Sequence, residues 1–151
     1  MKNSTLYIFL LSVLALSSCT RNHGDIGPWF GTWHVESIIS DNTPVNTEGD
    51  YFFQFQNKVF RVSLVTDYEQ LVESFGTWQE GEDGSMMSVS FPDSSVYYIV
   101  MPGLEVHNDF TVTNTSSRDI TFTKTDNSGK VYIYRLKKQP YQERLLTLSL
   151  K

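Results

Sequence analysis

The sequence predicts an all-β protein, folded as an up-and-down antiparallel β-barrel of about eight strands. Short runs rich in Val, Ile, Thr, Tyr and Phe alternate apolar and polar residues, which is typical of half-buried strands. Clusters of Gly, Asn, Asp, Ser and Pro separate these runs and predict tight turns between successive strands. A chain of hairpins leaves two strands with unpaired edges, and closing the sheet into a barrel removes both edges. The 151 residues suffice for one such domain.

Residues 1–18 have the composition of a signal peptide. Lys2 supplies a positive charge, and the apolar stretch that follows is too short to span a bilayer. The stretch ends in Leu16-Ser17-Ser18-Cys19, which resembles the lipobox of bacterial lipoproteins. This resemblance implies that Cys19 is lipidated, with acyl chains such as palmitate, and becomes the N-terminus of the mature protein. Residues 19–28 would then form a lipidated tether.

The lipobox predicts attachment to a membrane through Cys19 in the bacterial cell envelope, at the outer membrane. The sequence leaves open whether the domain lies on the periplasmic or the surface face. Cys19 is the only cysteine, so an internal disulfide is excluded. The net charge is −5, and removing residues 1–18, which hold one Lys and no acidic residue, changes it to −6. Because an acidic surface repels phosphate, no nucleic-acid partner is expected.

The tetrapeptide Phe-Gly-Thr-Trp occurs twice, at residues 30–33 and 75–78. A glycine lets the backbone bend sharply or approach another segment, and a tryptophan carries a large apolar area. This combination suits the closed end of a small barrel. We therefore assign Gly31, Trp33 and Gly76 to a structural base of the barrel.

The strands follow in order along the chain. The first, at residues 32–39, is expected to place Trp33, Val35, Ser37 and Ile39 on the inner face. Residues 40–50 predict a loop over one end of the barrel, and residues 66–73 predict one or two helical turns. The other predicted strands cover residues 51–56, 58–65, 86–91, 96–101, 110–114, 120–124 and 131–136 and a run opened by residues 75–78. Residues 139–151 form a C-terminal tail or an extra strand.

The two Gly-Thr-Trp segments, together with Pro44-Val45 between them and the lipobox, resemble the small lipocalin-like lipoproteins of Gram-negative bacteria. The resemblance covers most of the mature chain and implies a lipocalin-like barrel over residues 29–138. It assigns no catalytic residue and no ligand. The sequence shows neither the C-terminal helix nor the disulfides that are common among lipocalins.

No motif in the domain predicts catalysis. Neither His34 nor His107 lies in a nucleophile motif, and the sequence lacks a phosphate-binding loop and a dinucleotide fingerprint. His34 and Glu36 have the spacing of half a metal site, but zinc needs at least three protein ligands. We therefore expect a non-catalytic, monomeric domain without a cofactor or a metal site.

Two functions remain open. The first is binding of a small apolar or amphipathic ligand in the barrel mouth beside Phe53, Phe55, Trp78 and Met87, with the 40–50 loop as a lid. The second is a filled barrel that presents its loops and outer face to an envelope protein or a glycan. The residues expected to point inward are Trp33, Phe53, Phe55, Phe60, Val62, Trp78, Val89, Phe110, Phe122 and Ile133. This set leaves little empty volume, so a site for a large lipid is not expected.

Overall fold

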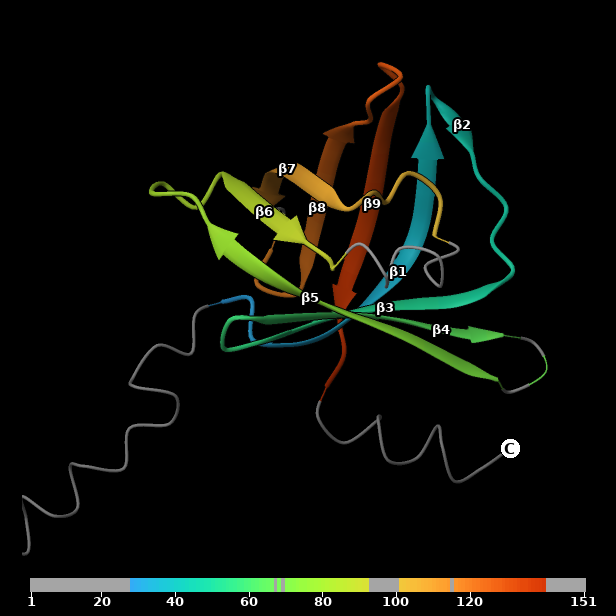
Figure 1. Cartoon of the computed structure of the whole chain (residues 1–151), viewed down its shortest axis with the longest axis horizontal. Helices are drawn as coiled ribbons and strands as arrows, with labels where there is room; N and C mark the ends of the chain where they lie inside the picture. Colours follow the sequence, from blue (N-terminus) through green and yellow to red (C-terminus); the bar gives the residue numbers. More distant parts are fainter. Residues whose placement is uncertain (1–27, 67, 69, 93–100, 115, 141–151) are drawn as a thin grey trace, which may run out of the picture.

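The computed structural model describes residues 28–66, 68, 70–92, 101–114 and 116–140, which form one antiparallel sheet (Figure 1). Eight strands close into a barrel, because β1 pairs with both β3 and β9, and the two-residue β2 is added beside the end of β1. The all-β barrel prediction is therefore confirmed. The strands are β1 (Gly31–Ser40), β2 (Thr43–Pro44), β3 (Gly49–Gln56), β4 (Val59–Thr66), β5 (Leu71–Glu80), β6 (Met86–Ser90), β7 (His107–Asn114), β8 (Asp119–Thr125) and β9 (Val131–Lys138).

Several sequence predictions lie outside the described residues. These are the signal peptide, the lipidated Cys19 and nearly all of the tether. The same holds for residues 96–100 of one predicted strand and for residues 141–151 of the predicted tail.

The alternating direction of the strands defines two ends of the barrel. The end that we call the base holds Pro28, the turns at residues 57–58, 81–85 and 116–118, and Gln139. The Lys138 Nζ atom donates to the Pro28 carbonyl (2.9 Å), so both termini of the described chain meet at the base. The opposite end, which we call the loop end, holds residues 41–48, the described part of the β6–β7 connection and the turn at residues 126–130.

A β-bulge in β1 changes which residues face inward. The register against β9 shifts between Val35, which pairs with Leu136, and Ser37, which pairs with Arg135. Trp33 and Val35 are buried as expected, but beyond the bulge Ile38 and Ser40 are buried instead. The prediction that Ser37 and Ile39 face inward is wrong, because the extra residue Glu36 reverses the alternation.

The inward face of β9 also differs from the prediction. Tyr132, Tyr134 and Leu136 are buried, whereas Ile133 belongs to the opposite, partly exposed face. The Tyr134 hydroxyl reaches the carbonyl of Pro102 and donates to it (2.8 Å). The face of Ile133 also carries the charged Arg135 and Lys137, which would be costly to bury.

The prediction of helical turns at residues 66–73 is wrong for the residues described there, because Thr66 and residues 71–73 belong to the strands of the β4–β5 hairpin. β4 continues to Thr66, and Val65 already pairs with Leu71 of β5. The Thr66 amide donates to the Gln70 carbonyl across the turn (3.0 Å). A helix of one or two turns has little stability of its own, so pairing between the two long strands prevails.

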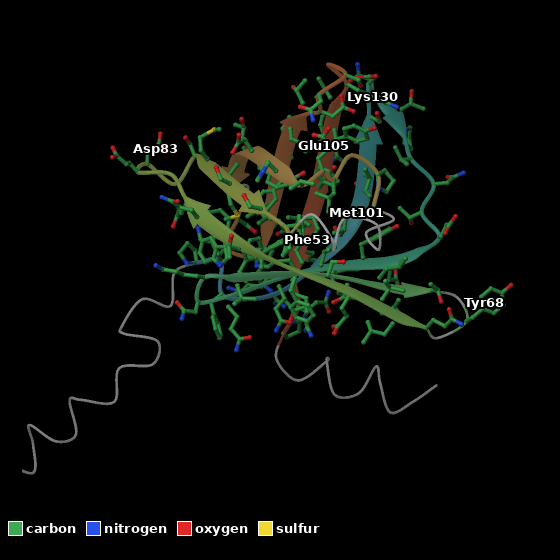
Figure 2. The ribbon with its side chains drawn as sticks, in the orientation of Figure 1. Phe53, Tyr68, Asp83, Met101, Glu105 and Lys130 are labelled. Carbon is green, nitrogen blue, oxygen red and sulfur yellow. The ribbon has the colours of Figure 1, made fainter. Side chains whose placement is uncertain are left out.

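Aromatic rings fill the middle of the barrel and its base. Ring centroids lie 5.1 Å apart for Phe53 and Phe60, 5.1 Å for Phe55 and Phe60, and 5.2 Å for Phe110 and Phe122. Figure 2 shows Phe53 in the middle of the molecule, surrounded by side chains from several strands. The interior at this level is a packed core.

Candidate functional site

The four residues predicted to bind a ligand lie inside the barrel. The exposed fractions of Phe53, Phe55 and Met87 are 0 %, and Trp78 is half-buried against the same core. The structure brings Phe55 and Trp78 into a T-shaped contact with ring centroids 5.4 Å apart. Met87 lies on β6, opposite Phe110 of β7. Phe53, Phe55 and Met87 therefore present no free surface in this structure, and Trp78 presents only part of its side chain.

The three residues assigned to the base lie close together. Gly31 pairs with Phe55, and Gly76 pairs with Phe60. Because Phe55 and Phe60 also pair with each other, the two glycines lie in one row across the sheet. A Cβ atom at Gly76 would lie 2.4 Å from the Ser90 carbonyl oxygen, a separation that only glycine permits.

The indole of Trp33 is fixed at the base. Its Nε1 atom donates to the carbonyl of Trp29 (2.9 Å), and both tryptophans are buried. Beside them is a pocket of about 230 Å³. This volume is below the range of about 300–1,000 Å³ that is usual for ligand pockets. The pocket is lined by Pro28, Trp29, Trp33, Ser116, Ser117 and Ile120.

A buried ion pair that was not predicted from the sequence lies toward the loop end. Lys124 follows Ile120 and Phe122 on the inward face of β8, and its side chain is only 1 % exposed. Its Nζ atom lies 3.0 Å from Glu105 Oε2 and 2.7 Å from Asn108 Oδ1. The alternation Ile120, Phe122, Lys124 was the signal that could have placed this lysine in the interior.

Hydrogen bonds tie Glu105 and Asn108 to each other and to a neighbouring turn. Asn108 is buried, its Nδ2 atom donates to the Glu105 carbonyl (2.7 Å), and the Glu105 amide donates to Asn108 Oδ1 (2.9 Å). The amide of Asn127 donates to Glu105 Oε1 (3.3 Å). We call Lys124, Glu105 and Asn108 the polar cluster.

Residues 101–106, which we call the plug, pack against the interior at the loop end. Met101 is 3 % exposed, and Leu104 packs against the core. A Cβ atom at Gly103, where φ is +80°, would lie 2.5 Å from both the Tyr132 ring and the Tyr134 hydroxyl. In Figure 2, Met101 and Glu105 lie between Phe53 in the middle of the barrel and Lys130 in the β8–β9 turn.

The tyrosine beneath the plug is strongly perturbed. Burial raises the pKa of Tyr134 well above its usual range, with smaller contributions from Tyr132, Glu105 and Asp126. Its hydroxyl therefore stays protonated and keeps donating to Pro102. This bond connects the plug to β9.

Comparison with known proteins identifies the fold. Neither a protein-family model nor a curated protein matches this sequence. Among solved structures, a lipocalin-like protein from Bacteroides uniformis matches with a TM-score of 0.58 and 20 % identity, covering 75 % of this chain and 100 % of that chain. The domain is a lipocalin-like barrel. An uncharacterized protein from Bacteroides eggerthii matches with a TM-score of 0.53 and 14 % identity, covering 74 % of this chain and 99 % of that chain.

The lipocalin-like barrel carries apolar residues on its outer face as well. Val59 of β4 and Leu71 and Phe75 of β5 are 47 %, 57 % and 52 % exposed. Between them, the Arg61 guanidinium pairs with the Glu73 carboxylate at 2.8 Å. This outer face combines apolar side chains with one ion pair.

The polar residues singled out in the sequence have ordinary partners in the lipocalin-like barrel. His34 Nε2 lies 3.3 Å from Asp50 Oδ1, and Glu36 Oε1 lies 3.4 Å from Lys137 Nζ. Within the described ranges, no three His, Cys, Asp or Glu side chains gather around a point where a metal ion could bind. No helix in the described part of the chain is long and apolar enough to cross a bilayer.

Proposed function

We propose that this protein is a lipid-anchored, non-catalytic barrel of the bacterial cell envelope that binds a small amphipathic ligand at its loop end. The observation that carries the proposal is the polar cluster. Among the described residues, Lys124 is the only charged residue that is buried. An ion pair in a protein interior is often no more stabilising than well-packed apolar residues of the same volume. The presence of this ion pair beside an aromatic core therefore favours recognition of a ligand.

The packed interior limits the size of the ligand. The rings of Phe53, Phe110 and Tyr134 contact one another in the middle of the barrel, with centroid separations of 6.2 Å for Phe53–Tyr134 and 5.9 Å for Phe110–Tyr134. A ligand at the loop end would rest on these rings. The predicted ligand-binding residues Phe55, Trp78 and Met87 would support the site from below, and Phe53 would border it.

Native mass spectrometry of the mature chain with Cys19→Ser tests ligand binding. The chain is exported by a signal peptide without a lipobox in its own host, purified gently, and measured before and after denaturation. We expect a reproducible excess mass that disappears on denaturation. A bare mass in every preparation would refute ligand binding.

The lipid anchor is tested separately. The unmodified chain should label with a palmitate analogue and fractionate with membranes, because two or more acyl chains hold a protein stably on a bilayer. Cys19→Ser should abolish both properties and leave the folded barrel intact. Labelling that survives this substitution would exclude Cys19 as the attachment site.

The second candidate function is a filled barrel that binds a partner protein or a glycan. The exposed side chains of Val59 and Phe75, on neighbouring strands, favour it, because exposed apolar residues side by side on an outer face are typical of interaction surfaces. A photo-crosslinking residue at position 75 in living cells tests it. One dominant adduct, together with a bare mass in the native spectrum, would establish the second function over the first.

A further inference from the structure

We infer that the ligand of this barrel carries one carboxylate on a short apolar body, and that the plug holds an internal substitute for it. The inference rests on the proposed binding function. Glu105 supplies the carboxylate of the substitute, and Met101 and Leu104 supply its apolar part. All three belong to residues 101–106, which pack on the interior of the loop end.

Lys124 is the fixed half of the ion pair. It lies on β8, a strand that is paired on both sides within the closed barrel. Its side chain is 1 % exposed, whereas that of Glu105 is 29 % exposed. Glu105 lies on the connection that precedes β7, where hydrogen bonds to Asn108 and Asn127 hold it but no strand pair does. If the pair separates, Glu105 therefore leaves and Lys124 stays inside.

A buried ammonium without a counter-charge is strongly unfavourable. The Lys124 Nζ atom has the two partners described above, Glu105 and Asn108. When Glu105 leaves, the neutral Asn108 Oδ1 atom, 2.7 Å away, is the one that stays. A carboxylate that enters in place of Glu105 restores the charge balance. A neutral or cationic head group does not, so the site selects for an anion.

The charge of the site favours a carboxylate over a phosphate. Lys124 is the only buried charged residue in the described part of the chain, so the interior offers one positive charge. A phosphate carries more negative charge and needs more donors than one ammonium and one amide provide. The head group that matches is a monoanion of the size of the Glu105 carboxylate.

The apolar part of the plug is suited to replacement. Met101 is buried, and methionine side chains adapt to gaps of many shapes. Next to Gly103 of the plug, Tyr132 and Tyr134 stack with centroids 6.3 Å apart and continue into the aromatic core. An alkyl chain could therefore replace Met101 and Leu104 above these rings, but it could not extend far down the barrel.

The test uses octanoate and octanol, which share the apolar body and differ in charge. Calorimetric titration of the mature chain with Cys19→Ser should show octanoate binding at least about tenfold more tightly than octanol. Glu105→Gln removes the internal carboxylate and leaves Lys124 without its counter-charge. This variant should therefore bind octanoate about tenfold more tightly than the parent protein does. Its affinity for octanol should equal that of the parent protein. Lys124→Met should lose the preference for octanoate.

Three outcomes would overturn the inference. The first is that octanol binds as tightly as octanoate. The second is that Glu105→Gln raises the affinity for both ligands equally, as a merely loosened plug would. The third is that Lys124→Met still binds octanoate more tightly than octanol. If Lys124→Met does not fold, the comparison of the two ligands on Glu105→Gln decides alone. Binding of octanol alone, or a neutral cargo in the native spectrum, would refute this inference and leave the proposed function standing. No binding of either ligand together with a bare native mass would refute both.

Discussion

Gly76 shows how a single side chain limits the packing of this barrel. Its backbone lies so close to β6 that a Cβ atom would be 2.4 Å from the Ser90 carbonyl oxygen and 3.0 Å from the Phe91 ring. Gly76→Ala should lower the free energy of unfolding by about 1–3 kcal/mol, because a carbonyl in a paired strand cannot move aside cheaply. Thr77→Ala, one residue further along the same strand at an exposed position, should cost less than about 1 kcal/mol. Urea denaturation measures both, and equal effects would contradict this account of Gly76.

Tyr134 links stability to alkaline pH. Burial raises the pKa of its hydroxyl, so only the neutral form fits the folded protein, whereas an unfolded chain ionises near pH 10. The resulting stability is fully present below about pH 10 and is lost as the pH rises above this value. Burial and Glu48 raise the pKa of Tyr51 in the same direction.

Tyr134→Phe should therefore change both the level and the pH profile of stability. At neutral pH it should cost about 1 kcal/mol, because the Pro102 carbonyl loses its donor. Above pH 10 the free energy of unfolding should fall less steeply than in the parent protein. Urea denaturation between pH 7 and pH 11 measures the profile, and an unchanged slope would show that Tyr134 is not responsible.

At the scale of the strand, the bulge in β1 makes neighbouring isoleucines unequal. Ile38 is 2 % exposed, whereas Ile39 faces the other side of the sheet and is half-buried. Ile38→Ala should destabilise the barrel by about 2–5 kcal/mol, as is usual for a buried isoleucine. Ile39→Ala should cost clearly less, and thermal unfolding of the two variants compares them directly. A larger loss from Ile39 would mean that β1 keeps simple alternation without a bulge.

The sequence predicted the strands better than their faces. Residues 51–56 and 58–65 were expected as a hairpin, and the structure has Gly49–Gln56 and Val59–Thr66. No glycine or proline marks the bulge at Glu36 in the sequence, so the prediction continued the simple alternation past this residue. In β9 both faces carry apolar residues, but the outward face also carries the charged Arg135 and Lys137, a signal that the prediction for Ile133 overlooked.

The candidate site was the least predictable part. The predicted ligand site consists of three aromatic residues and Met87, and Phe53, Phe55 and Met87 are fully buried. Lys124 was visible in the alternation of β8, but its partners Glu105 and Asn108 belong to another part of the chain. Contacts between residues so far apart depend on how the sheet closes, which alternation within one strand does not determine.

At the scale of the whole molecule, the base is where the tether joins the barrel. Pro28 lies at the base, and nine residues from Cys19 to Gly27 span at most about 30 Å. A lipid on Cys19 would therefore keep the base close to the bilayer and direct the loop end away from it.

Two lysines at opposite ends test this orientation. Lys58 is exposed in a turn at the base and Lys130 is exposed at the loop end. In the lipidated protein on vesicles, a fluorophore on Lys58→Cys should be quenched more strongly by a lipid-borne quencher than one on Lys130→Cys. Equal quenching, or stronger quenching at the loop end, would contradict the orientation.

The pairing of β1 with β9 also affects how the chain folds. Trp33 of β1 pairs with Lys138 of β9, whereas all other pairings join consecutive strands, apart from that of β1 with β3, which skips only the two-residue β2. During folding, β3 to β8 can pair in sequence, but the sheet stays open until β9 is in place. Pairing β1 with a strand so distant in the sequence is slow. Until β9 has paired, β1 and β8 each have an edge with unpaired backbone groups. The chain is therefore most prone to aggregate while β9 has not yet paired with β1.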